Sequence, residues 1–481
     1  MSLISGFAHE SIDLFFFLER KIFNAIAPTI KAIKIIEIIM IFKISKKYSF
    51  CKFMNYCGVE SQKNKIIFYF YRNLIMKYYT HKYNNGIRLI HKHIPSKVAY
   101  CGLLVNTGSR DETEKEFGIA HFIEHTLFKG TDKRKSYHIL NRMESVGGEI
   151  DAYTSKEETL IYGTFLNTYY DRFLELLSDI VFNSTFPQKE LQKEKIIVYD
   201  EINSYLDTPN ELIFDDFEEL LYKGHPLSKS ILGSQQSLEN INTNHINNFI
   251  KKKYNTDNMV LCSIGDIDFD KVKAIADKYF NNINSNFRKF KRTKFNSYKP
   301  FSKKIVKNTH QAHCIIGNIA YSSVDNKRTG LNLLNNIIGG QGMNSRLNLS
   351  LREKHGLAYH VESSYNKYFD TGNWQVYFGT DKENLDFSIE LVNKELKQVK
   401  NKKLGTLQLH RAKKQLIGQL AISVDNNANL FFTFSKSFLL YNKVDSLETV
   451  SEKINNITSE ELLEIANKIF DSNKLSTLIY I

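Results

Sequence analysis

Apolar and polar positions in the first half of the chain alternate between the period of a strand and the period of a helix. Asn85 and Gly86 lie between two runs of alternating apolar residues, which is a strong signal for a β-hairpin. Ala99–Thr107 is almost continuously apolar, as expected for a central strand. The same criteria predict strands at Ile150–Thr154, Thr159–Phe165 and Met259–Ile264, and helices at Tyr137–Val146, Asp171–Phe182, Gln188–Leu206, Pro209–Tyr222, Asn244–Tyr254 and Asp270–Phe280.

The second half of the chain repeats this order of elements. Ala312–Tyr321 has the pattern of a buried strand, and Gly330–Ile338 has the pattern of a helix. The strand TLIYGTF and its amphipathic helix correspond to WQVYFGT and the helix Asn384–Val399. Because the identity between the halves is low, the repeat rests on the order of elements, and it predicts two related domains.

A chain of 481 residues is too long for one ordinary hydrophobic core. Residues 1–78 are basic, and Lys31, Lys34 and Glu37 interrupt their apolar run, which argues against a clean membrane span. We expect an N-terminal extension outside the fold; the alternatives are weak membrane association and a transit-like presequence. The remaining segments are 79–285, a first domain; 286–302, a basic linker expected to be solvated; and 303–481, a second domain.

The composition excludes some partners and favours one compartment. The net charge is +13, but the basic residues are mostly scattered lysines without a recognition motif, so we expect no nucleic-acid partner. Five cysteines, odd in number and widely spaced, form neither a metal knuckle nor a disulfide framework. A reducing compartment follows, and we favour a bacterial-like cytoplasm over the mitochondrial matrix or the periplasm.

The pentapeptide HFIEH follows a polar loop at residues 108–118 and carries the most specific chemistry in the chain. His121 and His125 are four residues apart, so on a helix they share one face and can bind one metal ion. Glu124 can reach water on the same ion, and the order H-x-x-E-H is the inverse of the commoner zinc helix. The alternative is a solvated amphipathic helix that carries two histidines by chance.

The predicted helix Gln188–Leu206 carries two carboxylates that suit such a site. Glu194 and Glu201 are seven residues apart and therefore share a face. A metal held by two histidines needs a third protein ligand, and a ligating histidine needs an acceptor for its other N–H. The two glutamates suit these two functions, although either one alone is more typical of a solvated helix surface. His225, in a loop with Gly and Pro, is expected to be structural.

The spacing of these residues is recognisable. HFIEH, followed 76 residues after His125 by Glu201, resembles the pitrilysin or insulinase family of zinc peptidases. Within that family it is most similar to the beta subunit of the mitochondrial processing peptidase and its bacterial relatives. GSRDE, DAYTSKEE, HPLSKSILG and LREKHGLAY also resemble family landmarks, and the resemblance covers about residues 79–481. It implies an α+β fold of two related domains, each a mostly antiparallel sheet packed against helices, that face one another.

The resemblance also implies roles for the candidate residues. His121, His125 and Glu201 would bind one zinc ion per chain. Glu124 would be the catalytic general base, and Glu194 would be a catalytic-site carboxylate that supports the metal ligands.

A peptide-binding surface is implied as well. Arg352 and Tyr359 match a pair that contacts substrate in the family; without the resemblance, a helix-end salt bridge and a core tyrosine would be the simpler interpretation. An edge strand would pair with extended peptide, as in β-augmentation. The residues of this strand are Asp151, Ala152, Tyr153 and Thr154.

The chain is thus expected to be a zinc metalloendopeptidase that hydrolyses peptides or presequences. The first alternative is a non-catalytic structural subunit of the same fold, against which the intact His and Glu set argues. The second is a basic binder of membranes or nucleic acid that uses residues 1–78 and the linker. The resemblance implies that two chains of this size face each other. Because one chain carries both the metal set and the Arg–Tyr pair, a homodimer is expected, with a heterodimer containing an inactive homologue as the alternative.

Overall fold

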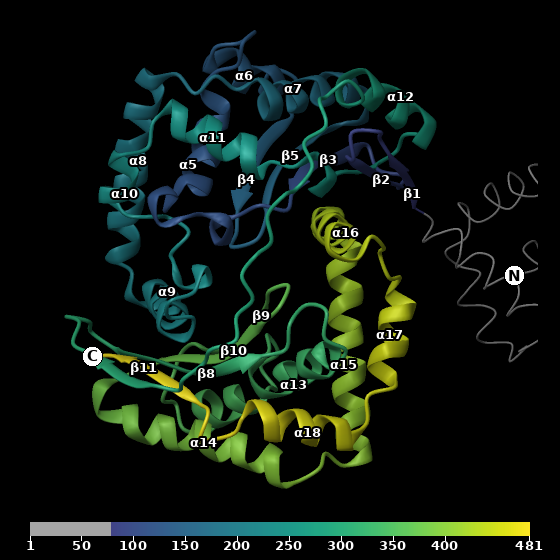
Figure 1. Ribbon diagram of the computed structural model, residues 1–481. Helices are drawn as coiled ribbons and strands as arrows, with labels where there is room; N and C mark the ends of the chain where they lie inside the picture. The colour runs from purple at the N-terminus through teal and green to yellow at the C-terminus, as the bar shows by residue number, and fades with distance from the viewer. Residues whose placement is uncertain (1–77) are drawn as a thin grey trace, which may run out of the picture. The chain divides into compact units, whose positions relative to one another are not determined.

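Two mixed β-sheets, one in each half of the chain, form the framework of the protein (Figure 1). The structure is a computed structural model that describes residues 78–481. The strands of the first sheet are β1 (Tyr79–Lys82), β2 (Arg88–His93), β3 (Val98–Val105), β4 (Glu149–Thr154), β5 (Thr159–Leu166) and β6 (Met259–Gly265). They lie in the order β1-β2-β6-β3-β5-β4, and only β2 and β6 are parallel neighbours.

The second sheet repeats this design with fewer strands. Its strands are β7 (Ser302–Ile305), β8 (Ala312–Ala320), β9 (Val361–Lys367), β10 (Gly372–Thr380) and β11 (Ser476–Tyr480). They lie in the order β7-β11-β8-β10-β9, and only β7 and β11 are parallel. Strand β10 is buried at every position, because helices cover both of its faces.

Helices cover one face of each sheet with their apolar sides. In the first half, Phe122 and Phe173 pack with the inward residues of the sheet. In the second half, Leu334 packs with Trp374 of β10. The helices of the first half are α5 (Ile119–Thr126), α6 (Ser136–Glu144), α7 (Tyr170–Asn183), α8 (Gln188–Leu206), α9 (Pro209–Leu221), α10 (Gln235–Glu239), α11 (Thr243–Lys253) and α12 (Phe269–Phe280). Those of the second half are α13 (Arg328–Gly339), α14 (Leu385–Asn401), α15 (Thr406–Asp425), α16 (Asn427–Tyr441), α17 (Leu447–Asn455) and α18 (Ser459–Ile469).

The halves exchange one helix each to cover the other face of the sheets. Helix α16 of the second half buries Phe431 and Phe434 against Val260 of the first sheet. Helix α9 of the first half buries Phe217 against Ile315 of the second sheet. Figure 1 shows α16 next to the first sheet and α9 next to the second. Burial of these aromatic side chains joins the two halves through apolar surface.

The expected fold is confirmed: each half is a mostly antiparallel sheet packed against helices. The helix predicted at Gln188–Leu206 coincides with α8, and the strand predicted at Ala312–Tyr321 is β8 with one residue fewer. Local sequence features explain this agreement, because Pro187 directly precedes α8 and the nearly continuous apolar run of β8 is typical of a buried strand.

The extension predicted at residues 1–78 falls outside the described residues, except for Tyr78. The ring of Tyr78 contacts Phe434 edge-on, with 5.9 Å between the ring centroids. The membrane and presequence alternatives for the extension lie outside the described residues too. From residue 78 to residue 481, every helix is too short or too polar to cross a bilayer.

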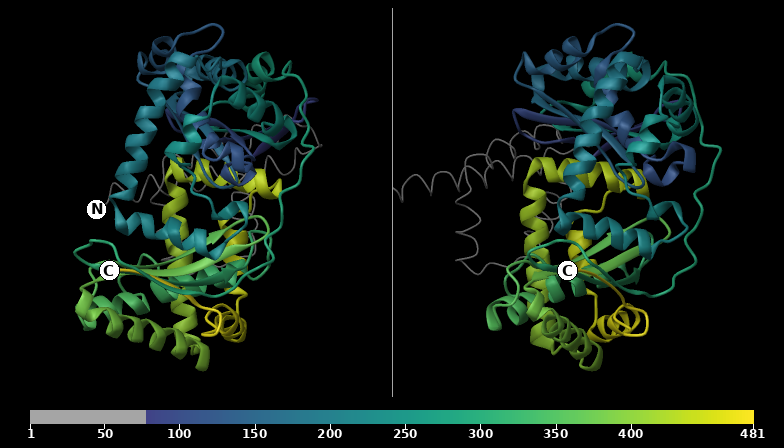
Figure 2. Two further views of the ribbon diagram at one scale, coloured as in Figure 1. Left: turned by 60° about the vertical axis from the view of Figure 1, so that its left-hand side comes forward. Right: turned by 90° about the vertical axis from the view of Figure 1, so that its left-hand side faces the viewer.

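The linker differs from its prediction. Residues 284–301 form no helix or strand and run along one side of the protein between its halves (Figure 2). The expectation of a solvated connector is wrong for Arg288 and Arg292, whose side chains are only 14% and 11% exposed. Both guanidinium groups form ion pairs with Asp111, at 3.2 and 2.7 Å. The sequence could not predict this, because the partner lies far away along the chain.

Candidate metal and peptide site

Helix α5 carries the H-x-x-E-H residues, and its start is fixed by two features. Gly118 adopts a left-handed conformation at the N-cap (φ +84°), where a Cβ atom would come within 2.7 Å of Gly233 Cα. The carboxylate of Glu112 accepts hydrogen bonds of 2.9 Å from the N–H groups of Gly118 and Ala120. Burial raises the pKa of the Glu112 carboxyl to about 8, although these N–H groups at the positive end of the helix act in the opposite direction.

The three predicted metal ligands converge on one point. The candidate ligand atoms of His121, His125 and Glu201 all lie within 4.8 Å of one another. The Nε2 atoms of the two histidines are 3.7 and 3.3 Å from the carboxylate oxygens of Glu201. Helix α5 supplies both histidines from one face, and α8 crosses it closely enough to supply the glutamate.

Glu194 orients one of the histidines. Its Oε1 atom lies 3.2 Å from Nδ1 of His125, and its Oε2 atom lies 2.7 Å from Nζ of Lys129. A carboxylate accepts hydrogen bonds, so Nδ1–H of His125 is the donor and the Nε2 atom of that ring faces Glu201. This arrangement matches the carboxylate–histidine pairs that support bound metals.

Burial and charge make the two histidines differ. Burial, together with the neighbouring His125, lowers the pKa of His121 to about 4. Burial also acts to lower the pKa of His125, but hydrogen bonds to Glu194 and Glu201 outweigh it and raise the pKa to about 9. The hydrogen bond with His125 in turn lowers the pKa of Glu201. The pocket therefore holds negative charge that favours a cation between the ligands.

The residues fit a zinc ion. Two imidazole nitrogens and one carboxylate oxygen are the donors of a known class of catalytic zinc sites, with a fourth position for water. His121 is buried, its Nδ1 atom has no hydrogen-bond partner among residues 78–481, and its Nε2 atom faces Glu201 at 3.7 Å.

Glu124 lies beside this set without joining it. Burial raises the pKa of its carboxyl to about 6, although the Thr154 hydroxyl and His125 act in the opposite direction. Its Oε2 atom is buried and has no hydrogen-bond partner in the described chain. A carboxyl group with a pKa near the operating pH and a free oxygen can take and return a proton.

The predicted edge strand borders the same helix. Strand β4 pairs with β5 alone among the described strands, so its other edge is free. Strand β4 lies beside α5. The Asp151 carboxylate therefore raises the pKa of Glu124, and a hydrogen bond with the Thr154 hydroxyl lowers it. Asp151 also accepts a hydrogen bond of 3.1 Å from the hydroxyl of Tyr162. A free strand edge next to the general-base candidate could align an extended chain.

Arg352 and Tyr359 contact each other but not the metal cluster. The Arg352 guanidinium carbon lies 5.5 Å from the centroid of the Tyr359 ring, and Arg352 also lies 3.6 Å from Glu353. Tyr359 is 86% exposed, so the interpretation as a core tyrosine is wrong. Within residues 78–481 neither side chain forms a hydrogen bond or ion pair with the His and Glu set. Their contact with substrate stays a prediction.

Several residues that shape the site were not predicted. Glu112 bonds to the start of helix α5, and Lys129 pairs with Glu194. Arg110, two residues before Glu112, is buried in a cluster of ion pairs. The loop at residues 108–118 carries the available signal, because GSRDE places three charged residues just before the metal helix. His225 is structural in this arrangement, since both ring nitrogens bond to backbone groups.

Comparisons with known proteins agree with this fold. Residues 88–235 match the family model described as insulinase (peptidase family M16), and residues 240–416 match the one described as peptidase M16 inactive domain. The chain is 34% identical to an uncharacterized zinc protease of Rickettsia felis, over 83% of this chain and 96% of that protein. It is 28% identical to the beta subunit of the mitochondrial processing peptidase of Saccharomyces cerevisiae, over 81% and 87% of the two chains.

A solved structure supports the fold. The crystal structure of a peptidase M16 inactive domain from Pseudomonas fluorescens superposes with a TM-score of 0.79 at 20% identity. The superposition covers 84% of this chain and 98% of that one. At this identity the likeness concerns the fold alone.

Proposed function

This chain belongs to peptidase family M16, and we propose that it is a zinc-dependent endopeptidase that hydrolyses peptides or presequences. The observation that carries the proposal is the convergence of His121, His125 and Glu201 within 4.8 Å, from two helices far apart in sequence. The resemblance expected from the sequence is confirmed at the level of the family, and the relative in Rickettsia felis is named a zinc protease.

His121, His125 and Glu201 would hold the zinc ion, and Glu194 would keep the ring of His125 in place. A bound zinc ion would supply Lewis-acid activation of the attacked carbonyl and of the attacking water. Glu124 would take the proton of that water on its free oxygen and later deliver it to the leaving amine. The partial burial of Glu124 raises its pKa to about 6 and so suits it to both proton transfers.

The substrate class follows from the free edge of β4. An extended peptide would form backbone hydrogen bonds along Asp151–Thr154 and so present one carbonyl at a time beside Glu124. Arg352 and Tyr359 would contact the same peptide from the second half. Backbone pairing is insensitive to side chains, which favours a range of peptides over one sequence.

The word inactive in the description of one family model concerns the part of the chain without the metal residues. The match to the inactive domain covers residues 240–416, whereas His121, Glu124 and Glu201 all lie within the match to the insulinase model at 88–235. The absence of catalytic groups from that half is therefore compatible with an active first half. A non-catalytic structural subunit remains the second candidate, since some matches carry the word inactive.

One experiment tests the proposal. The purified protein is analysed for zinc and incubated with a mixed peptide library, with and without a chelator. We expect about one zinc per chain and cleavage that the chelator abolishes and added zinc restores. A protein that binds zinc but cleaves nothing would favour the structural subunit. The homodimer and the cytoplasmic location also remain predictions, and sedimentation of the same sample tests the first.

A further inference from the structure

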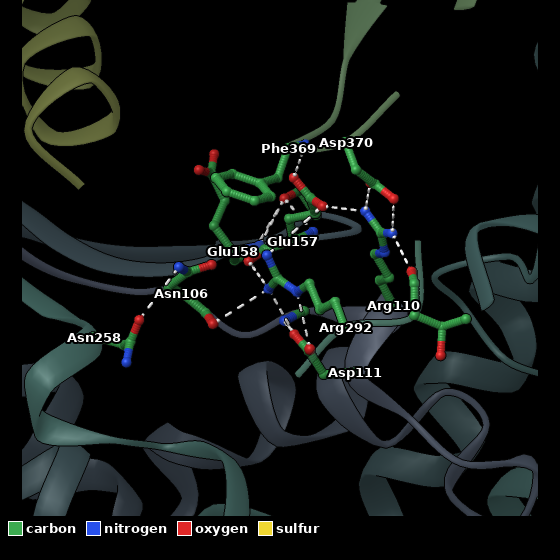
Figure 3. Close-up of polar contacts among 12 residues, drawn as sticks. Asn106, Arg110, Asp111, Glu157, Glu158, Asn258, Arg292, Phe369 and Asp370 are labelled. Carbon is green, nitrogen blue, oxygen red and sulfur yellow. Dashed lines mark hydrogen bonds and ion pairs between the residues drawn. The ribbon is translucent and has the colours of Figure 1, made fainter. Parts of the chain in front are cut away.

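Three consecutive charged residues before the metal helix each hold a different part of the protein. Arg110, Asp111 and Glu112 lie in one tight turn and are about 5% exposed or less. Figure 3 shows Arg110 and Asp111 in a cluster that residues from both halves and the linker complete. Buried charges cost free energy unless partners compensate them, so this cluster needs an explanation.

Arg110 holds the second half. Its guanidinium forms a two-pronged contact with Asp370, at 2.6 and 2.9 Å, and a further bond of 2.5 Å with Glu157. Asp370 lies in the turn between β9 and β10, and it also accepts a hydrogen bond of 2.8 Å from the N–H of Phe295 in the linker. Paired donors on a planar guanidinium fix both distance and orientation.

The same turn of the second half is held at two more points. The backbone N–H of Phe369 donates a bond of 2.9 Å to Glu157. The hydroxyl of Tyr368 and the amide of Asn373 donate to one oxygen of Glu218 on α9, at 2.9 and 2.8 Å. The turn at residues 368–371 is therefore bound to the first half through polar contacts with Arg110, Glu157 and Glu218.

Asp111 and Glu112 face the linker and the metal helix. Asp111 pairs with Arg288 and Arg292 of the linker. Glu112 bonds to the first N–H groups of α5, as described above. One residue thus separates the arginine that holds the second half from the carboxylate that holds the metal helix.

The turn is also tied to the loop after the edge strand. The N–H groups of Ser109 and Arg110 donate to the carbonyls of Ser155 and Lys156, at 3.1 and 2.8 Å. At Gly108 the backbones are so close that a Cβ atom would lie 2.2 Å from the Ser155 carbonyl oxygen. A displacement of this turn would therefore move both α5 and the end of β4.

We propose that Asp370 is a positioning residue: by docking on Arg110, it sets the geometry of the metal helix and of the peptide-binding edge. The half without catalytic groups thereby controls the catalytic groups of the other half. The inference rests on the proposed function for its effect on turnover, and on the bonds above for the coupling itself. Three guanidinium groups (Arg110, Arg288, Arg292) face three carboxylates (Asp111, Glu157, Asp370), so removing one carboxylate leaves an uncompensated positive charge.

The test compares the full-length protein with Asp370→Asn and, as a matched control, Asp386→Asn on the exposed first turn of α14. Hydrogen exchange of backbone amides is measured at residues 118–125 and 155–158. We expect exchange in both segments to rise about tenfold in D370N and to stay unchanged in D386N. Unchanged exchange in both segments, with faster exchange only at residues 368–371, would show that Asp370 merely joins the halves and would overturn the proposal.

Kinetics on the mixed peptide library give the second readout. In D370N we expect kcat to fall by about tenfold to a hundredfold, KM to change less, and zinc content to stay at one per chain. A change in KM alone would overturn the positioning role. Where D370N does not fold, Asp370→Glu keeps the charge and displaces it by one methylene, and its exchange at residues 118–125 decides the question in the same way. Exchange does not depend on proteolysis, so an inactive wild-type protein would refute the proposed function and leave this measurement valid.

Discussion

The Nδ1 atom of His125 lies 3.2 Å from Oε1 of Glu194, and this contact joins the metal helix to α8. It fixes which nitrogen of His125 faces Glu201 and brings a neutralising lysine, Lys129, to the other oxygen of Glu194. A residue that a sequence pattern presents as a surface glutamate is in fact 5% exposed. Four predictions follow from this site and from the surrounding core.

Glu194→Gln should weaken zinc binding by about tenfold to a hundredfold, because the amide is a poorer acceptor for His125 and no longer pairs with Lys129. Competition with a metal-sensitive dye measures the affinity. Glu190→Gln, on the first turn of the same helix, is the control, because among residues 78–481 Glu190 pairs only with Lys193. Equal affinity in both variants would remove Glu194 from the site.

Glu124→Gln should keep zinc at the wild-type level and lower kcat by about a hundredfold to ten-thousandfold. The amide cannot accept the proton of the attacking water, whereas His121 and His125 are untouched. Zinc analysis and peptide cleavage on one sample separate the two effects. Full activity in this variant would exclude Glu124 as the general base.

Glu201→Gln should lose most of its zinc, because a neutral amide replaces the carboxylate that faces both Nε2 atoms. His121→Ala should behave alike, since it removes a ligand from the same face of α5. Metal analysis after dialysis checks both variants. A wild-type zinc content in the glutamate variant would point to a different third ligand.

Stability should depend on pH through His91. This residue is fully buried, with Nδ1 3.0 Å from Ser263 Oγ and Nε2 2.9 Å from the Ile267 carbonyl. Burial lowers its pKa from 6.5 to about 4. The stabilisation is therefore complete above pH 6.5 and is lost as the pH falls to 4, because the unfolded chain takes up the proton first. Across that window we expect a loss of about 3 kcal/mol in the free energy of unfolding.

Urea unfolding at several pH values tests this expectation. His91→Gln should reduce the slope between pH 6.5 and 4, at the cost of some stability at neutral pH. His245→Gln, which removes an exposed histidine, is the control. Equal slopes in the wild type and H91Q would show that another group titrates in this range.

The sequence by itself determined the local elements and the identity of the chemistry. The local sequence predicted α8 with its observed bounds, and the spacing of His121 and His125 placed both rings on one face of a helix. These features depend on neighbours within a few residues, so a linear pattern contains them. The spacing of Glu194 and Glu201 further restricted which carboxylates could complete the metal site.

Only the tertiary structure decided which distant groups meet. Arg110 and Asp370 are 260 residues apart, and nothing near either one indicates the other. The exchange of α9 and α16 between the halves, and the ion pairs of the linker arginines, likewise depend on how the two sheets are joined. The physical reason is that a buried charge needs a partner within reach. The chain topology decides which groups are within reach, and no local pattern encodes that topology.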